Sequence, residues 1–170
     1  EHQRYFTVFD QSGRLLSKFI AVSNGTADVD TVAKGNEKVL RARLEDARFF
    51  YGEDLKEPLE KKVDRLKEVV FLEGLGTLYD KTQRIRTLAA FIAQIWDLPG
   101  AAMADLDRAA YLCKADLVTN MVYEFPELQG VMGSYYAAAQ GEREAVTQGI
   151  REHYQPRFMG DEVPKTPIGR

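Results

Sequence analysis

The sequence has few of the side chains that most often bind metals or act as nucleophiles. Cys113 is its only cysteine, which excludes an internal disulfide and a zinc site built from several thiolates. A single cysteine also fits a reducing compartment. The two histidines, His2 and His153, have neither a second histidine four residues away nor a suitably spaced cysteine. The sequence therefore predicts no metal site and no complete catalytic centre.

Long apolar runs are also missing. No stretch approaches the roughly 20 residues that a membrane helix needs, and the first residues, EHQRYFTVFD, are not a basic segment followed by an apolar one, as a signal peptide would be. Hydrophobic residues make up 45% and charged residues 29%, a mix that can bury a core. We expect a cytoplasmic protein with no membrane partner. The absent initiator Met and the ending KTPIGR indicate a piece of a longer protein.

An excess of positive charge is absent as well. The net charge is −3, whereas a freestanding nucleic-acid-binding protein is usually more basic. One local row of cations stands out, because Lys34, Lys38 and Arg41 follow the i, i+4, i+7 spacing of one helix face. Such a row can lie along phosphates. Glu37 and Glu45 dilute it, so an ordinary solvated face is the alternative.

The pattern of residues predicts a mainly α chain, a helical bundle preceded by a short β-hairpin. Residues 4–9 and 15–22 are rich in aromatic and β-branched residues, and Gly13 lies in the connection between them. Asp28 or Asp30 is a candidate cap for the first helix, which Gly35 weakens enough to delay its proper start to residues 35–36.

Apolar spacing then predicts about six helices, separated by proline and glycine. Their expected ranges are 29–51, 59–70, 75–96, 105–125, 126–141 and 142–154, with a helix junction at Gly74 to Gly76. The residues from Gly160 onward are predicted to be an extended tail or linker. The predicted domains are therefore a hairpin that ends a preceding domain (1–27), a helical domain (28–159) and the tail (160–170).

Two side chains with reactive groups have simple structural explanations. Cys113 lies on the apolar stripe of its helix, as an inert core thiol would, and Lys114 can lower its pKa only if both reach solvent. His153 lies in the last turn of a helix, where a cation suits the helix dipole. The sequence therefore predicts no catalytic role for either.

Four stretches are more distinctive than a helical bundle requires. They are GNEKVLRARLEDARFF (35–50), FLEGLGTLYDK (71–81), KADLVTNMVYEFPELQGVMGSYYA (114–137) and HYQPRFMGDEVP (153–164). Their order and spacing resemble the β subunits of the bacterial tetrameric glycyl-tRNA synthetase family. The resemblance implies that a partner α subunit carries the catalytic core and uses ATP and Mg, while the β subunit handles the glycine tRNA. It implies no cofactor and no catalytic residue in this chain.

The same resemblance implies a helical domain of the HD type. Metal-dependent HD phosphohydrolases hold a divalent ion with histidines and a carboxylate, but Lys81, Cys113 and Lys114 stand at the corresponding positions here. A lysine ammonium has no lone pair to offer a metal. The resemblance therefore implies an HD fold without its metal, in which Lys81, Arg84 and Lys114 form a second candidate set of phosphate contacts.

Two other functions remain open at this point. One is an HD-type phosphohydrolase that uses carboxylates such as Asp80 and Asp116 in place of the histidines. The other is a protein-interaction bundle that does not touch RNA.

Overall fold

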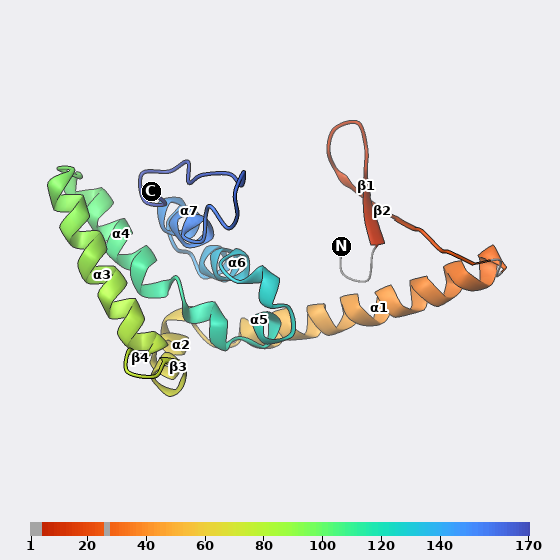
Figure 1. Cartoon of the computed structure of the whole chain (residues 1–170), viewed down its shortest axis with the longest axis horizontal. Coiled ribbons are helices and arrows are strands. Elements are labelled where there is room, and N and C mark those ends of the chain that lie inside the picture. Colours follow the sequence, from red (N-terminus) through yellow and green to blue (C-terminus); the bar gives the residue numbers. More distant parts are fainter. Residues whose placement is uncertain (1–4, 26–27) are drawn as a thin grey trace. The chain divides into compact units, whose positions relative to one another are not determined.

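The computed structural model describes residues 5–25 and 28–170, and the chain divides into two compact units, Glu1–Asp46 and Ala47–Arg170. Within the described ranges it forms seven α-helices and two small two-stranded sheets, which confirms the mainly helical prediction (Figure 1). The domain boundaries predicted at 27/28 and 159/160 remain predictions.

The first sheet is the predicted hairpin. β1 (Tyr5–Phe9) pairs antiparallel with β2 (Leu15–Ala21). The turn depends on two residues: Gly13 has φ +79°, and the Asp10 carboxylate accepts backbone N–H groups of Ser12 and Arg14, each at 2.9 Å. His2, Arg4 and Thr26 lie outside the described residues.

The first helix, α1 (Val29–Asp54), begins at Val29, before the delayed start that Gly35 predicts. The Asp28 carboxylate caps it by accepting the Thr31 backbone N–H at 2.9 Å and the Thr31 hydroxyl at 2.8 Å. An N-cap stabilises a helix by about 1 kcal/mol, which is what a mid-helix glycine costs. The cap at Asp28 is therefore confirmed, and the delayed start at Gly35 is wrong.

The second predicted helix is much shorter than expected. α2 (Leu59–Arg65) passes into a 3-10 turn, η2 (Leu66–Glu68), and then into the hairpin of β3 (Val70–Leu72) and β4 (Gly76–Thr77). Gly74 and Gly76 have φ of +81° and +82°, values that glycine adopts without strain. The predicted helix junction at these glycines is therefore wrong, because Gly74 lies in the turn between the two strands and Gly76 is the first residue of β4.

The next two helices start at positions set by their caps. α3 (Leu78–Ile95) begins with a capping box between Thr77 and Asp80, and α4 (Gly100–Leu112) begins directly after Pro99. The predicted start of α4 at Asp105 or Asp107 is wrong. Asp105 is instead buried and pairs with Arg143 at 2.9 Å.

The long helix predicted for 105–125 is broken into short pieces. The remaining elements are η3 (Ala115–Val118), α5 (Asn120–Glu124), η4 (Pro126–Leu128), α6 (Val131–Ala139) and α7 (Glu144–Glu152). Two buried carboxylates stabilise the starts of α5 and α6. Asp54 accepts the backbone N–H groups of Asn120 and Met121 at 2.9 Å each, and Asp116 accepts those of Gly130 and Gly133 at 2.6 and 3.0 Å.

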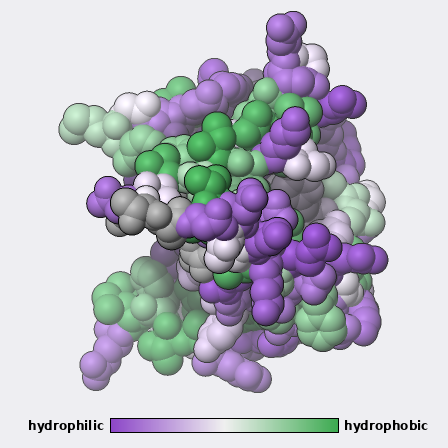
Figure 2. All heavy atoms as spheres, turned by 90° about the vertical axis from the view of Figure 1, so that its right-hand side faces the viewer, coloured by the Kyte–Doolittle hydropathy of each residue, from purple (hydrophilic) through white to green (hydrophobic). Residues whose placement is uncertain are grey.

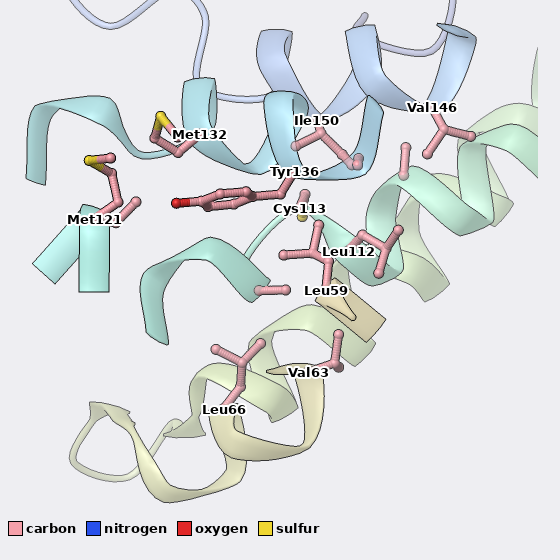
Figure 3. Close-up of a cluster of buried hydrophobic side chains, with 14 of the residues drawn as sticks. Leu59, Val63, Leu66, Leu112, Cys113, Met121, Met132, Tyr136, Val146 and Ile150 are labelled. Atoms are coloured by element: carbon pink, nitrogen blue, oxygen red, sulfur yellow. The ribbon is translucent and has the colours of Figure 1, made fainter. Parts of the chain in front are cut away.

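The hydrophobic core belongs to the second unit. Figure 3 shows side chains of α2, α4, α6 and α7 meeting around the Tyr136 ring, including Leu59, Leu112 and Ile150. Tyr136 stacks on Tyr51 with ring centroids 5.5 Å apart, and its hydroxyl donates to Asp54 at 2.9 Å. Helix α4 lies beside both α3 and α7, and these three helices line the site described below.

The last residues form neither helix nor strand, but they are anchored to α7. The Glu152 carboxylate accepts the Thr166 backbone N–H at 3.0 Å and the Thr166 hydroxyl at 2.7 Å. Ile168 fits against Gly149, where a Cβ atom would lie 2.5 Å from the Ile168 Cγ2 atom. The segment predicted to be an extended tail therefore packs on the bundle.

Apolar side chains also reach the surface. Figure 2 shows hydrophobic residues beside hydrophilic ones on the face that it draws. On α3, Leu88, Phe91, Ile95 and the adjoining Trp96 are each about 60% exposed. No helix in the described ranges combines the length and apolarity needed to cross a bilayer.

Candidate functional site

A cavity of about 490 Å³ lies between α3, α4, α7 and residues 167–170. Ile85 and Ile92 of α3, Trp96, Leu106 of α4 and Ile168 supply an apolar wall. The cavity exists because several lining residues on the same helices have small side chains, namely Ala89, Ala93, Ala109 and Ala110. The helical spacing of these residues brings them to the side of each helix that faces the others.

Lys114 also lines the cavity. It follows the last turn of α4, is only 5% exposed, and places its Nζ atom 2.8 Å from Nε2 of His153. The same ammonium lies 3.7 Å from the centroid of the Tyr154 ring, a cation–π contact. Burial lowers the pKa of Lys114 to about 8, so the group is still mainly protonated at pH 7.

His153 accepts the Lys114 hydrogen bond as a neutral imidazole. Its Nδ1 lies 2.6 Å from the Ile150 carbonyl oxygen, so Nδ1–H is the donor there and Nε2 is left as the acceptor for Lys114. Burial, and then the charge of Lys114, lower the pKa of His153 to about 3. The sequence prediction of a cation at the end of α7 is therefore wrong, because desolvation outweighs the helix dipole.

Cys113 is a core thiol, as predicted. Its side chain is buried, and its Sγ donates to the Ala110 carbonyl oxygen at 3.3 Å. Burial raises its pKa to about 11, even though the charge of Lys114 acts in the opposite direction. The thiol is therefore protonated at neutral pH and is a poor nucleophile.

The second candidate set of cations is only partly brought together. Lys81 lines the same cavity as Lys114, and its Nζ lies 3.8 Å from the centroid of the Phe71 ring. Arg84, one turn further along α3, is exposed and is not among the residues that line the cavity. Lys114 is covered, so of this set only Arg84 is openly exposed to solvent.

The cavity does not offer a suitable donor set for a divalent metal. Lys81 and Lys114 carry positive charge and no free lone pair, the Cys113 thiol is protonated, and the Nε2 lone pair of His153 is used by Lys114. Among residues 5–25 and 28–170, no group of three or more His, Cys, Asp or Glu side chains is placed to hold a metal ion.

The two carboxylates that the phosphohydrolase alternative requires accept hydrogen bonds from backbone N–H groups. Asp80 accepts the Thr77 backbone N–H and hydroxyl, both at 2.8 Å, and this hydrogen bonding lowers its pKa. Asp116 is fully buried against Gly130 and Gly133, and burial raises its pKa to about 6. Both carboxylates therefore have structural roles, Asp80 at the start of α3 and Asp116 at the start of α6.

The first candidate set lies on α1, in the unit Glu1–Asp46. Lys34, Lys38 and Arg41 are all exposed, and their spacing keeps them within one face of the helix. Within the ranges that the structure describes, none of the three forms an ion pair. They are free to meet an anionic surface.

Sequence reasoning missed two groups at the cavity, the His153 imidazole as a partner of Lys114 and the Tyr154 ring. No spacing rule connects them, since 39 residues separate Lys114 from His153. It also missed that residues 167–170 complete the wall.

Known proteins resemble this chain over its whole length. Residues 1–170 match the family model described as glycyl-tRNA synthetase beta subunit. The glycine–tRNA ligase beta subunits of Moorella thermoacetica and Desulforamulus reducens are each 56% identical over 170 residues, which cover 99% of this chain and 24% of each relative. That of Lactobacillus helveticus is 51% identical, with 99% of this chain and 25% of the relative covered. The chain spans about a quarter of the length of these relatives, and it belongs to the glycyl-tRNA synthetase beta subunit family.

Proposed function

We propose that this chain is a non-catalytic part of a glycine–tRNA ligase that binds tRNA and the partner subunit, and so supports the ATP-dependent attachment of glycine to tRNA. The observation that carries this proposal is the match of all 170 residues to the beta subunit family. Its partners would be the α subunit, which would use ATP and Mg, and the glycine tRNA, in the cytoplasm. No cofactor is assigned to the chain itself.

RNA contact is proposed for the row Lys34, Lys38 and Arg41. Three exposed cations on one helix face can meet successive phosphates, and such contacts are possible in a chain whose overall charge is −3. Lys81, Arg84 and Lys114 are the weaker candidates, because burial of Lys114 keeps its ammonium from a phosphate on the molecular surface.

We also infer that the helical part is an HD-type domain that has lost its metal site. The resemblance assigned Lys81, Cys113 and Lys114 to the former ligand positions. All three line the same cavity although α3 and the end of α4 are distant in sequence, and this convergence supports the assignment. The phosphohydrolase alternative is not favoured, since Asp80 and Asp116 bind backbone N–H groups.

The RNA proposal is tested in the complete ligase with the triple variant K34A/K38A/R41A. We expect weaker tRNA binding and a shallower dependence of affinity on salt, by about one unit of slope for each phosphate that the variant no longer neutralises. Formation of glycyl-adenylate should be unchanged, because that step needs no tRNA.

A matched control is K56A/K61A/K165A, which removes the same charge from exposed positions elsewhere. If the two triple variants bind tRNA with equal affinity and equal salt slopes, the row on α1 does not contact RNA. The chain would then act as a spacer or as a protein-interaction bundle.

A further inference from the structure

The cavity between α3, α4, α7 and residues 167–170 has an unbalanced charge. Of its lining residues that the structure describes, Lys81, Lys114 and Arg170 are cationic, and none is acidic. His153 contributes a neutral ring, and its only free nitrogen lone pair is already used by Lys114. The charged groups that line the cavity are therefore all cationic donors, with no anionic acceptor among them.

Lys114 has hydrogen-bonding capacity to spare. An ammonium group has three N–H donors. One is directed at His153, and the Tyr154 ring accepts a cation–π contact. In the part of the chain that the structure describes, no carboxylate lies within ion-pair distance of Lys114 or Lys81. A buried ammonium without a counter-charge is unfavourable, and an anion in the cavity would remove that penalty.

The rest of the cavity wall is apolar. Ile85, Ile92, Trp96, Leu106 and Ile168 line it, and its volume of about 490 Å³ is in the range of small-molecule sites. A bare inorganic anion would leave this wall in contact with water, whereas an uncharged apolar molecule would leave the ammonium groups unpaired. Only a ligand with both an anionic group and an apolar body matches the cationic and the apolar residues of the lining.

We propose that this cavity binds a small amphipathic anion, a monocarboxylate whose head group meets the Lys114 and Lys81 ammonium groups and whose apolar body covers the wall formed by α3, α4 and Ile168. This site is separate from the cationic row on α1 and does not depend on RNA binding. It gives the chain a ligand in addition to its proposed partners.

The test uses decanoate as the probe and Trp96 as the reporter. Trp96 is the only tryptophan of the chain, and it lines the cavity, so its fluorescence reports occupancy directly. We expect a saturable change below the micelle concentration of decanoate. Decanol, which has the same tail and no charge, and inorganic phosphate, which has no tail, should each bind at least about tenfold more weakly.

Variants connect the binding to the ammonium groups. K114M keeps most of the buried stem but removes the charge, and we expect it to weaken decanoate binding at least about tenfold. If circular dichroism shows that K114M does not fold, K81M takes its place. K61M, at an exposed site on α2 that does not line the cavity, should leave the affinity unchanged. The proposal is overturned if no saturable response occurs, if decanol binds as tightly as decanoate, or if the folded cavity variants keep full affinity.

Discussion

Asp54 is a buried side chain of the second unit that accepts four hydrogen bonds. Its two oxygens accept the Asn120 and Met121 backbone N–H groups, the Asn120 side-chain amide and the Tyr136 hydroxyl, all at 2.9 Å. We expect Asp54→Ala to lower the free energy of unfolding by about 3 kcal/mol, because it leaves several donors without an acceptor.

Tyr136→Phe is the matched control for this prediction, since it removes only one of the four hydrogen bonds and should cost about 1 kcal/mol. Urea unfolding measures both variants. Equal losses in the two would show that the start of α5 does not depend on Asp54.

The lowered pKa of His153 makes the free energy of unfolding depend on pH. Its pKa is about 3 in the folded chain and ordinarily 6.5, so the folded state binds fewer protons between these values. The contribution of His153 to stability is complete above pH 6.5 and is lost as the pH falls toward 3, by at most about 1.4 kcal/mol per pH unit. Lys114, Arg157 and Lys81 are the cations that oppose its protonation.

The comparison of wild type with His153→Gln isolates this effect. Asp116, whose pKa is raised to about 6, acts in the opposite sense, because its contribution is complete below about pH 3.8 and is lost as the pH rises through 6. Both proteins contain Asp116, so the difference between them reports the histidine alone. A constant difference from pH 7 to pH 4 would mean that His153 is not held neutral.

At the scale of elements, the anchoring of residues 160–170 can be tested at a glycine. We expect Gly149→Ala to destabilise the chain by about 1 kcal/mol or more, because the new Cβ would lie 2.5 Å from Ile168 Cγ2 and 3.1 Å from Ala109 Cβ. Gly52→Ala, in α1, meets nothing within 4 Å and should stabilise by about 0.5 to 1 kcal/mol. Thermal unfolding measures both. The same sign in both variants would contradict the packing of Ile168.

The elements that the sequence predicted well are the ones with local signals. The Gly13 turn and the Asp28 cap act within a few residues, and both are found. The helix predicted over 105–125 is different, because the start of α5 within that range is stabilised by Asp54, which lies 66 residues before Asn120. Such a contact leaves no periodic pattern. Gly74 and Gly76 indicate a break in the chain, but a turn and a helix junction both use glycine, so the sequence does not distinguish them.

The candidate site was predictable only in part. The family resemblance predicts that Lys81 and Lys114 lie together, and both line one cavity. Their environment was not predicted, because burial of Lys114 and its bond to His153 depend on how α4 and α7 pack. The exposed row on α1 needed only helical spacing.

At the scale of the whole molecule, stability is unevenly distributed. None of the described residues before Ala47 is buried, whereas every member of the hydrophobic core lies at Leu59 or beyond. We therefore expect backbone amides of β1 and β2 to exchange with deuterium far faster than those of α4, α6 and α7. Hydrogen-exchange mass spectrometry measures this. Equal protection would mean that the first unit has a core of its own.

The same hairpin has a consequence for handling the chain in solution. β1 and β2 pair only with each other among the described residues, so each strand has an outer edge of unpaired N–H and C=O groups. Phe6 and Ile20 are more than half exposed on these strands. An open, partly apolar edge is a template for the addition of strands from other molecules. A sheet of only two strands is marginally stable in water, so added strands would stabilise it. Concentrated samples should therefore begin to self-associate at the hairpin, and a charged residue in place of Ile20 should delay their turbidity.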